Sequence, residues 1–287
     1  MTRDKKRVLV TGGTKSDVAA IGTFALNIKE TNSHLFSKLV VFHDGISKKD
    51  QKVIEDIIDT DFIKYKLPFK SKNDVIVNYF SPMLFCKYEC FKLLEDYEEV
   101  VWSDYDVLIK EKLDELCDFS GAGLIIVADP KKKIRDMFFK EILNHGIYDY
   151  DLSKEALCTP LFSVSREIGN FMDMYHWCYE KTMEYEADLE LAEQCIISLL
   201  VQQFATTYAA LSPEIYACHP RDAKGKEKIL HSYGQPKFWS GLKNDDWDRL
   251  YNIWLGMGGS KYNDRKKVFM SKVRLLITRI LGIRARK

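Results

Sequence analysis

Two aspartates separated by a single residue stand directly after a strongly apolar run. Asp104 and Asp106 follow residues 100–102 (VVW), which have the composition of a buried strand. Because residues i and i+2 of an extended backbone point to the same side, both carboxylates can face one ion. Hard oxygen ligands suit Mg²⁺ or Mn²⁺, and such ions commonly bridge the phosphates of a bound nucleotide. The chain has 42 acidic residues, so it is the position after a strand that makes this pair a candidate metal site.

A histidine and a lysine in the last quarter of the chain offer complementary chemistry. Residues 229–239 read ILHSYGQPKFW and contain His231, Gly234 and Lys237. An imidazole nitrogen beside two carboxylates favours Mn²⁺ over Mg²⁺, and a lysine supplies positive charge to a departing phosphate. The alternative is a surface histidine and lysine in a Gly/Pro turn. The occurrence of both segments in one chain, in this order, favours the chemical interpretation.

Together these segments resemble glycosyltransferase family 8. The second matches the family's H-x-x-G-x-x-K-P-W motif at four of five positions, with Phe238 where proline is usual. The resemblance implies a metal site formed by Asp104, Asp106 and His231. It implies contacts to the donor diphosphate from Gly234 and Lys237. It also implies a GT-A fold, a UDP-sugar donor and retention of anomeric configuration, in a divergent member of the family.

Weaker matches extend the resemblance over residues 8–240. Lys87 stands where the family usually has an arginine near the donor, and Asp129 resembles the aspartate that hydrogen-bonds the donor sugar. The first loop, which normally carries an aspartate and an asparagine around the uridine, instead begins with Thr11 and Gly12. We expect the donor to be bound by Thr11, Gly12, Lys87, Asp104, Gly234 and Lys237. The altered loop leaves the identity of the base open.

Glu193 and Gln194 resemble the Asp-Gln pair beside the transferred sugar in that family, and they are the candidate catalytic residues together with Asp129. Retention needs either a double displacement or an attack from the same face. In the first route Glu193 is the nucleophile. In the second, Gln194 steadies the sugar while a phosphate oxygen takes the acceptor proton, and the family precedent favours this route.

The resemblance therefore predicts transfer of galactose or glucose from a UDP-sugar to a glycan or lipid-linked saccharide, in the synthesis of lipopolysaccharide, capsule or another surface glycan. Two alternatives stay open. One is a catalytically silent protein that binds sugar nucleotides or acts as a membrane scaffold. The other is a nucleotidyltransferase, which would use the same metal and type of sheet but release pyrophosphate.

The elements expected around these residues alternate between strands and helices. Apolar runs predict strands at 8–10, 39–42, 100–102 and 124–128. Helical spacing and capping predict helices at 19–29, 47–58 (with Ser47 as N-cap) and 83–94. Such alternation indicates an α/β fold, with a mainly parallel sheet covered by helices on both faces and a binding site at the carboxyl ends of the strands. We expect one catalytic domain over residues 1–255.

The composition is typical neither of a disordered protein nor of one with a signal region or a membrane-spanning helix. With 46% hydrophobic and 30% charged residues the chain is that of a globular protein, and it has neither an apolar signal region nor a run of about 18 apolar residues. Its seven cysteines form no CxxC pair, which favours a reducing compartment.

Positive charge is concentrated at the C-terminal end. Residues 265–287 carry nine Lys or Arg and no acid. Because the net charge of the whole chain is +1, the other 264 residues have a net charge of −8. A generally basic surface that binds nucleic acid is therefore not expected. Apolar residues recur at helical spacing in this segment. We therefore expect residues 256–287 to form a basic amphipathic tail that attaches a cytoplasmic enzyme to the anionic inner face of the cell membrane.

Overall fold

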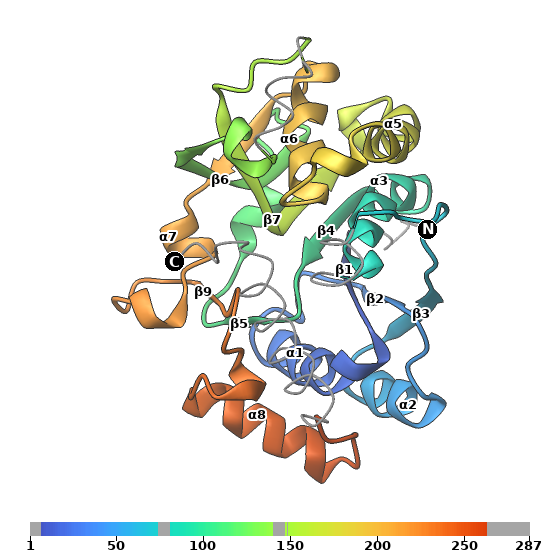
Figure 1. Cartoon of the computed structure of the whole chain (residues 1–287). Coiled ribbons are helices and arrows are strands. Elements are labelled where there is room, and N and C mark those ends of the chain that lie inside the picture. The colour runs from blue at the N-terminus through green and yellow to red at the C-terminus, as the bar shows by residue number, and fades with distance from the viewer. Residues whose placement is uncertain (1–6, 74–80, 140–146, 148, 263–287) are drawn as a thin grey trace, which may run out of the picture.

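A seven-stranded sheet forms the centre of the computed structural model, which describes residues 7–73, 81–139, 147 and 149–262 (Figure 1). The strands lie in the order β3-β2-β1-β4-β7-β6-β8. Their bounds are β1 Arg7–Gly13, β2 Lys38–His43, β3 Thr60–Lys64, β4 Glu99–Ser103, β6 Leu124–Lys133, β7 Glu155–Ser165 and β8 Tyr208–Leu211. Two further strands, β5 (Val107–Ile109) and β9 (Ile229–His231), pair with each other in a separate small sheet.

The central sheet is mainly parallel, as the alternation of strands and helices predicts. β1 pairs in parallel with β2 and β4, β2 with β3, and β6 with β8. β7 alone runs against its neighbours β4 and β6. Strands buried on both faces need apolar side chains on both sides, so they occur in the sequence as continuous apolar runs. All four strands predicted from such runs are present in the sheet.

Each of the four predicted strands is longer than expected, and β6 extends furthest. β6 does not end before Asp129 and Pro130 but continues to Lys133, which pairs with Glu155 of β7. The register shifts between Asp129 and Lys133, and an irregularity of this kind tolerates a proline that cannot donate to a regular ladder.

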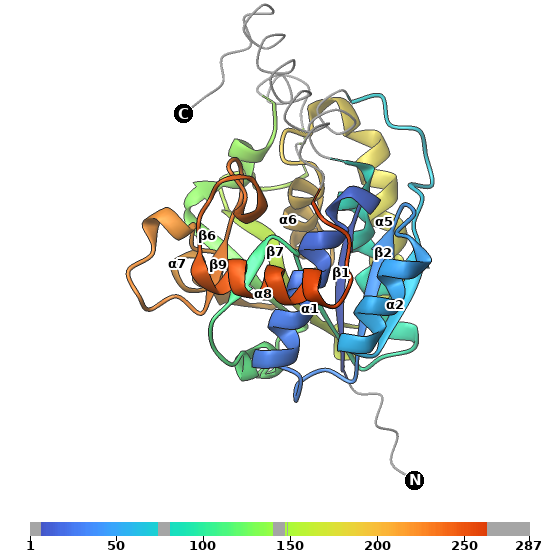
Figure 2. The same ribbon diagram turned by 90° about the horizontal axis from the view of Figure 1, so that it is seen from below.

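Helices cover both faces of the sheet and form a hydrophobic core on each. Successive side chains of β1 point alternately into these two cores. Leu9 packs in one core with residues of α1 (Val18–Thr31), α2 (Lys48–Ile57) and α8 (Asp245–Gly256). Val8 and Val10 pack in the other with residues of α3 (Glu89–Lys92), α5 (Phe171–Glu184) and α6 (Glu193–Gln203). Figure 2 shows the first face, with α8, α1 and α2 together. A short helix, α7 (Pro213–Tyr216), contacts β6 and β9.

Two helix predictions differ in their outcome. The N-cap of α2 is Ser47, whose hydroxyl accepts a hydrogen bond from the backbone N–H of Asp50 at 3.1 Å, as expected. The helix expected over 83–94 is instead a 3₁₀ segment (Pro82–Tyr88) followed by the short α3 and a second 3₁₀ turn (Leu93–Glu95). Residues 85–88 are all buried, so packing against the sheet places these side chains rather than one amphipathic stripe.

The chain after α8 folds back onto the domain. The backbone N–H and hydroxyl of Ser260 both donate to the Asp50 carboxylate at 2.9 Å, and the Trp254 indole donates to the Ser260 carbonyl at 2.9 Å. Residues 257–262, expected to begin the tail, therefore contact α2 and α8. Residues 263–287, which include the basic segment, lie outside the described residues. Among those that are described, no helix combines the length and apolar character needed to span a bilayer.

Gly22→Ala is expected to destabilise the protein by about 1–3 kcal/mol, because a Cβ at residue 22 would lie 2.3 Å from the Trp254 ring. Gly256→Ala, at the end of α8, is the matched control. A Cβ there meets no atom within 4 Å, and alanine is the better helix former by up to about 1 kcal/mol. Urea unfolding measures both changes. Equal midpoints for Gly22→Ala and the wild type would show that the indole moves aside without cost.

Candidate metal and donor site

The pairing of β5 with β9 brings together two segments that are distant in sequence. Val107 lies opposite His231 in this antiparallel ladder. Directly beyond it, the backbone N–H and the hydroxyl of Ser232 both donate to the Asp106 carbonyl at 2.9 Å. These backbone contacts fix the histidine beside the two aspartates.

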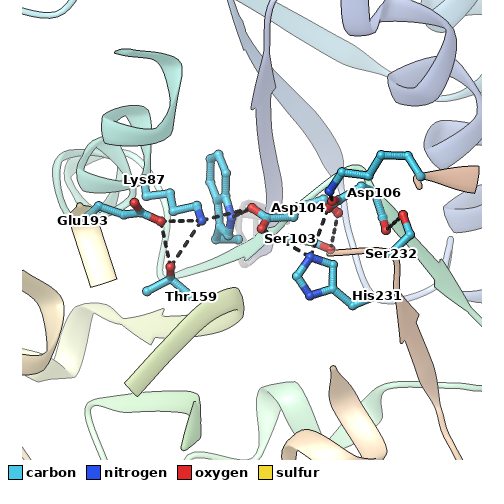
Figure 3. Close-up of polar contacts among 10 residues, drawn as sticks. Lys87, Ser103, Asp104, Asp106, Thr159, Glu193, His231 and Ser232 are labelled. Atoms are coloured by element: carbon cyan, nitrogen blue, oxygen red, sulfur yellow. Dashed lines mark hydrogen bonds and ion pairs between the residues drawn. The ribbon is translucent and has the colours of Figure 1, made fainter. Parts of the chain in front are cut away.

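The three side chains expected to bind metal converge on one point (Figure 3). His231 Nε2 lies 3.2 Å from Asp106 Oδ1 and 3.9 Å from Asp104 Oδ2. One ligand atom from each of the three residues lies within 4.8 Å of the others. Two carboxylates and one imidazole are a donor set that fits Mn²⁺ or Mg²⁺. Asp104, Asp106 and His231 would together hold one such cation.

Asp106 is the most buried member of this cluster, and its charge is compensated locally. Its Oδ2 forms an ion pair with Lys237 Nζ, and its Oδ1 faces His231. Burial alone would raise the pKa of Asp106, but Lys237 and His231 hold it well below its usual range. Lys237 follows the turn at Gly234, where the backbone is left-handed (φ 70°) and favours glycine. Asp106 is therefore ionised at neutral pH.

Asp104 belongs to a second polar network that extends away from the histidine (Figure 3). Its Oδ1 accepts a hydrogen bond from Trp102 Nε1 at 2.8 Å and lies 3.1 Å from Lys87 Nζ. Lys87 reaches Glu193 Oε1 at 2.8 Å, and the Thr159 hydroxyl donates to the same oxygen at 2.9 Å. Burial lowers the pKa of Lys87, but Asp104 and Glu193 outweigh this and raise it above its usual value. Lys87 is a buried cation between two carboxylates.

The remaining predicted residues are distributed around this centre. Thr11, in β1, is fully buried, and its hydroxyl has no hydrogen-bond partner. A Cβ on Gly12 would lie 2.3 Å from Cys86 Sγ and 3.3 Å from the Trp102 ring, so the residue allows close packing at the end of β1. Gln194 is half-buried in the first turn of α6, directly after Glu193.

Asp129 lies in β6, apart from the network of Lys87. Its Oδ1 accepts a hydrogen bond from the Lys131 backbone at 3.0 Å. It lines a cavity of about 370 Å³ together with residues of β8 and α7, among them Leu211 and Glu214.

The family follows from comparison of the chain with known proteins. Residues 8–152, half of the chain, match the model of Glycosyl transferase family 8. The chain belongs to this family. It is a glycosyltransferase with the GT-A fold, and its low identity to solved structures marks it as a divergent member. A search of curated proteins found no match.

Solved glycosyltransferases share this fold at low identity. The galactosyltransferase LgtC, in complex with donor and acceptor sugar analogs, superposes with a TM-score of 0.62 at 15% identity, covering 87% of this chain and 99% of LgtC. The bifunctional glycosyltransferase WbbM gives 0.66 at 14% identity, covering 90% of this chain and 52% of WbbM. GlyE of Streptococcus pneumoniae TIGR4 gives 0.56 at 16% identity, covering 91% and 66%.

Three contacts of the site are not among the residues predicted from the sequence. They come from Trp102, Thr159 and Ser232. Thr159 lies in β7, where no sequence motif marks it. Each of the other two lies within a segment singled out from the sequence, but nothing in the residue type alone indicates a partner.

Lys87→Met is expected to lower the free energy of unfolding by about 3–5 kcal/mol, because it leaves the carboxylates of Asp104 and Glu193 without their shared cation. Adding Glu193→Gln removes one of these stranded charges. The double variant should therefore be less destabilised than the sum of the two single variants. Urea unfolding of all four proteins completes the cycle, and strict additivity would contradict the ion pair.

Proposed function

We propose that this glycosyltransferase moves galactose or glucose from a UDP-sugar to a glycan acceptor, with Mn²⁺ or Mg²⁺ held by Asp104, Asp106 and His231. The convergence of these three ligand groups, supplied by two distant segments, carries the proposal. A bound divalent cation would neutralise the diphosphate as it leaves. Membership of the family and the ligands of LgtC, a galactosyltransferase solved with donor and acceptor analogs, support a nucleotide-sugar donor.

Lys237 places a second positive charge at the same point. Its ammonium group contacts Asp106 and so lies within the ligand cluster. Glycosyl transfer passes through an oxocarbenium-like transition state in which charge develops on the leaving phosphate. A cation already oriented beside that phosphate stabilises the charge without reorganisation. Gly234, whose left-handed turn precedes Lys237, brings the backbone close to the same diphosphate.

The contacts of Glu193 favour same-face attack over a double displacement. Its Oε1 is engaged by Lys87 and by the Thr159 hydroxyl. A carboxylate whose charge is neutralised in this way is a weak nucleophile. Retention then results from attack on the face from which the diphosphate departs, with Gln194 and Asp129 orienting the sugar and a phosphate oxygen accepting the acceptor's proton.

The acceptor is a glycan or lipid-linked saccharide, and the product a surface glycan such as lipopolysaccharide or capsule. The basic composition of residues 265–287 supports attachment to the anionic inner face of the cell membrane, where such acceptors are assembled. The enzyme is in this view cytoplasmic and peripheral, with its site open to a lipid-linked substrate.

Calorimetric titration of UDP-galactose and UDP-glucose tests the donor site. With Mn²⁺ we expect binding of at least one sugar nucleotide, and EDTA should abolish it. Asp106→Ala should weaken binding at least tenfold, because it removes a ligand and releases Lys237, which that carboxylate orients. Asp56→Ala, an exposed aspartate on α2, is the control and should bind like the wild type. Absence of binding for both sugars would exclude the two proposed donors, and metal-independent binding would contradict the proposed metal site.

Deletion of residues 265–287 tests the membrane attachment. We expect the truncated protein to hydrolyse the donor at the wild-type rate but to sediment at least tenfold less with anionic vesicles, since each basic residue near such a surface contributes about 1 kcal/mol. Neutral phosphatidylcholine vesicles provide the control, because the electrostatic attraction is missing there. Undiminished binding of the truncated protein to anionic vesicles would contradict the proposal.

A further inference from the structure

The indole N–H of Trp102 is directed at one of the expected metal ligands. Trp102 lies in β4, two residues before Asp104, and is 1% exposed. A buried indole N–H needs a hydrogen-bond partner. It finds one in Asp104 Oδ1, at 2.8 Å. A charged acceptor makes such a bond shorter and stronger than a neutral one.

The same carboxylate oxygen has a second donor. Lys87 Nζ lies 3.1 Å from Asp104 Oδ1 and 5.5 Å from the centre of the Trp102 ring. Lys87 is itself held by Glu193 and Thr159, at 2.8 Å and 3.2 Å. Two groups with fixed positions thus occupy Oδ1. The other oxygen, Oδ2, is the one that faces His231.

We propose that Trp102 is a positioning residue for the metal site: its N–H, acting with Lys87, holds the Asp104 carboxylate so that Oδ2 is presented to the cation shared with Asp106 and His231. The inference rests on the proposed metal dependence. A carboxylate bound at one oxygen by two donors has lost the rotation about its Cβ–Cγ bond that would carry Oδ2 out of the cluster. Groups that orient metal ligands in this way typically account for a 10–100-fold difference in metal affinity.

The packing of Trp102 can be separated from this role. Its ring stacks on Phe162 with centroids 6.4 Å apart, and a Cβ on Gly12 would lie 3.3 Å from it. Phenylalanine retains an aromatic face for this stack but has no N–H. Trp254 offers a matched control: it is fully buried, its indole N–H also donates a hydrogen bond, to the Ser260 carbonyl at 2.9 Å, and it packs on the opposite face of the sheet.

The test compares Mn²⁺ binding by wild type, Trp102→Phe and Trp254→Phe in the absence of any sugar nucleotide, with free Mn²⁺ quantified by its electron paramagnetic resonance signal. We expect Trp102→Phe to bind Mn²⁺ 10–100-fold more weakly and Trp254→Phe to bind within twofold of the wild type. Equal affinity of Trp102→Phe and wild type would overturn the inference. A wild-type protein that binds no Mn²⁺ would instead remove the proposed metal site, and the positioning role with it.

A second measurement needs no variant of Trp102. In wild-type protein with ¹⁵N-labelled indoles, saturating Mg²⁺ should shift the Trp102 indole resonance and leave that of Trp254 in place. The reason is that cation binding at Oδ2 withdraws electron density from the acceptor oxygen of Trp102. An unshifted Trp102 resonance at a Mg²⁺ concentration that saturates the protein would overturn the inference even if Trp102→Phe fails to fold.

Discussion

A three-residue strand pairing is the constraint on which the site depends. β5 carries the chain away from the two aspartates, and β9 delivers His231 opposite Val107. β5 is held on both edges, because the side-chain amide of Asn27 in α1 bonds the backbone N–H and C=O of Ile109 at 2.7 and 2.9 Å. Without this anchoring, the histidine and Lys237 would have no fixed position relative to Asp104 and Asp106. A short ladder therefore determines whether the ligands form one cluster.

Carboxylates alternate with nitrogen-bearing side chains along the polar groups that this pairing assembles. In spatial order they are Glu193, Lys87, Asp104, His231, Asp106 and Lys237. Each carboxylate has a nitrogen-bearing neighbour, which offsets the cost of removing it from water. Lys237 and His231 also hold the pKa of the buried Asp106 below its usual range, which keeps this carboxylate ionised. The contacts that stabilise these buried acids are thus also those that would prepare the proposed metal site.

The sequence predicts those parts of the molecule that depend on local pattern. The apolar run 100–102 predicts β4, and the D-x-D spacing and the H-x-x-G-x-x-K segment predict the three residues whose ligand atoms converge. The rest depends on contacts between distant segments. Thr159 meets Glu193, and β7 reverses against β4, for reasons that lie in the assembled sheet and not in any window of residues. Local periodicity likewise cannot distinguish a 3₁₀ segment at 82–88 from the expected α-helix.

The buried pair of Lys87 and Glu193 also bears on how the sequence has diverged. Relative to the family pattern it resembles, the chain has a lysine in place of an arginine and a glutamate in place of an aspartate. The first exchange shortens the cation and the second lengthens the acid by one methylene, so the contact of 2.8 Å still closes. A change in the length of only one of the two side chains would disturb this contact. Lys87 and Glu193 therefore constrain each other's length: a shorter side chain at one position is matched by a longer one at the other.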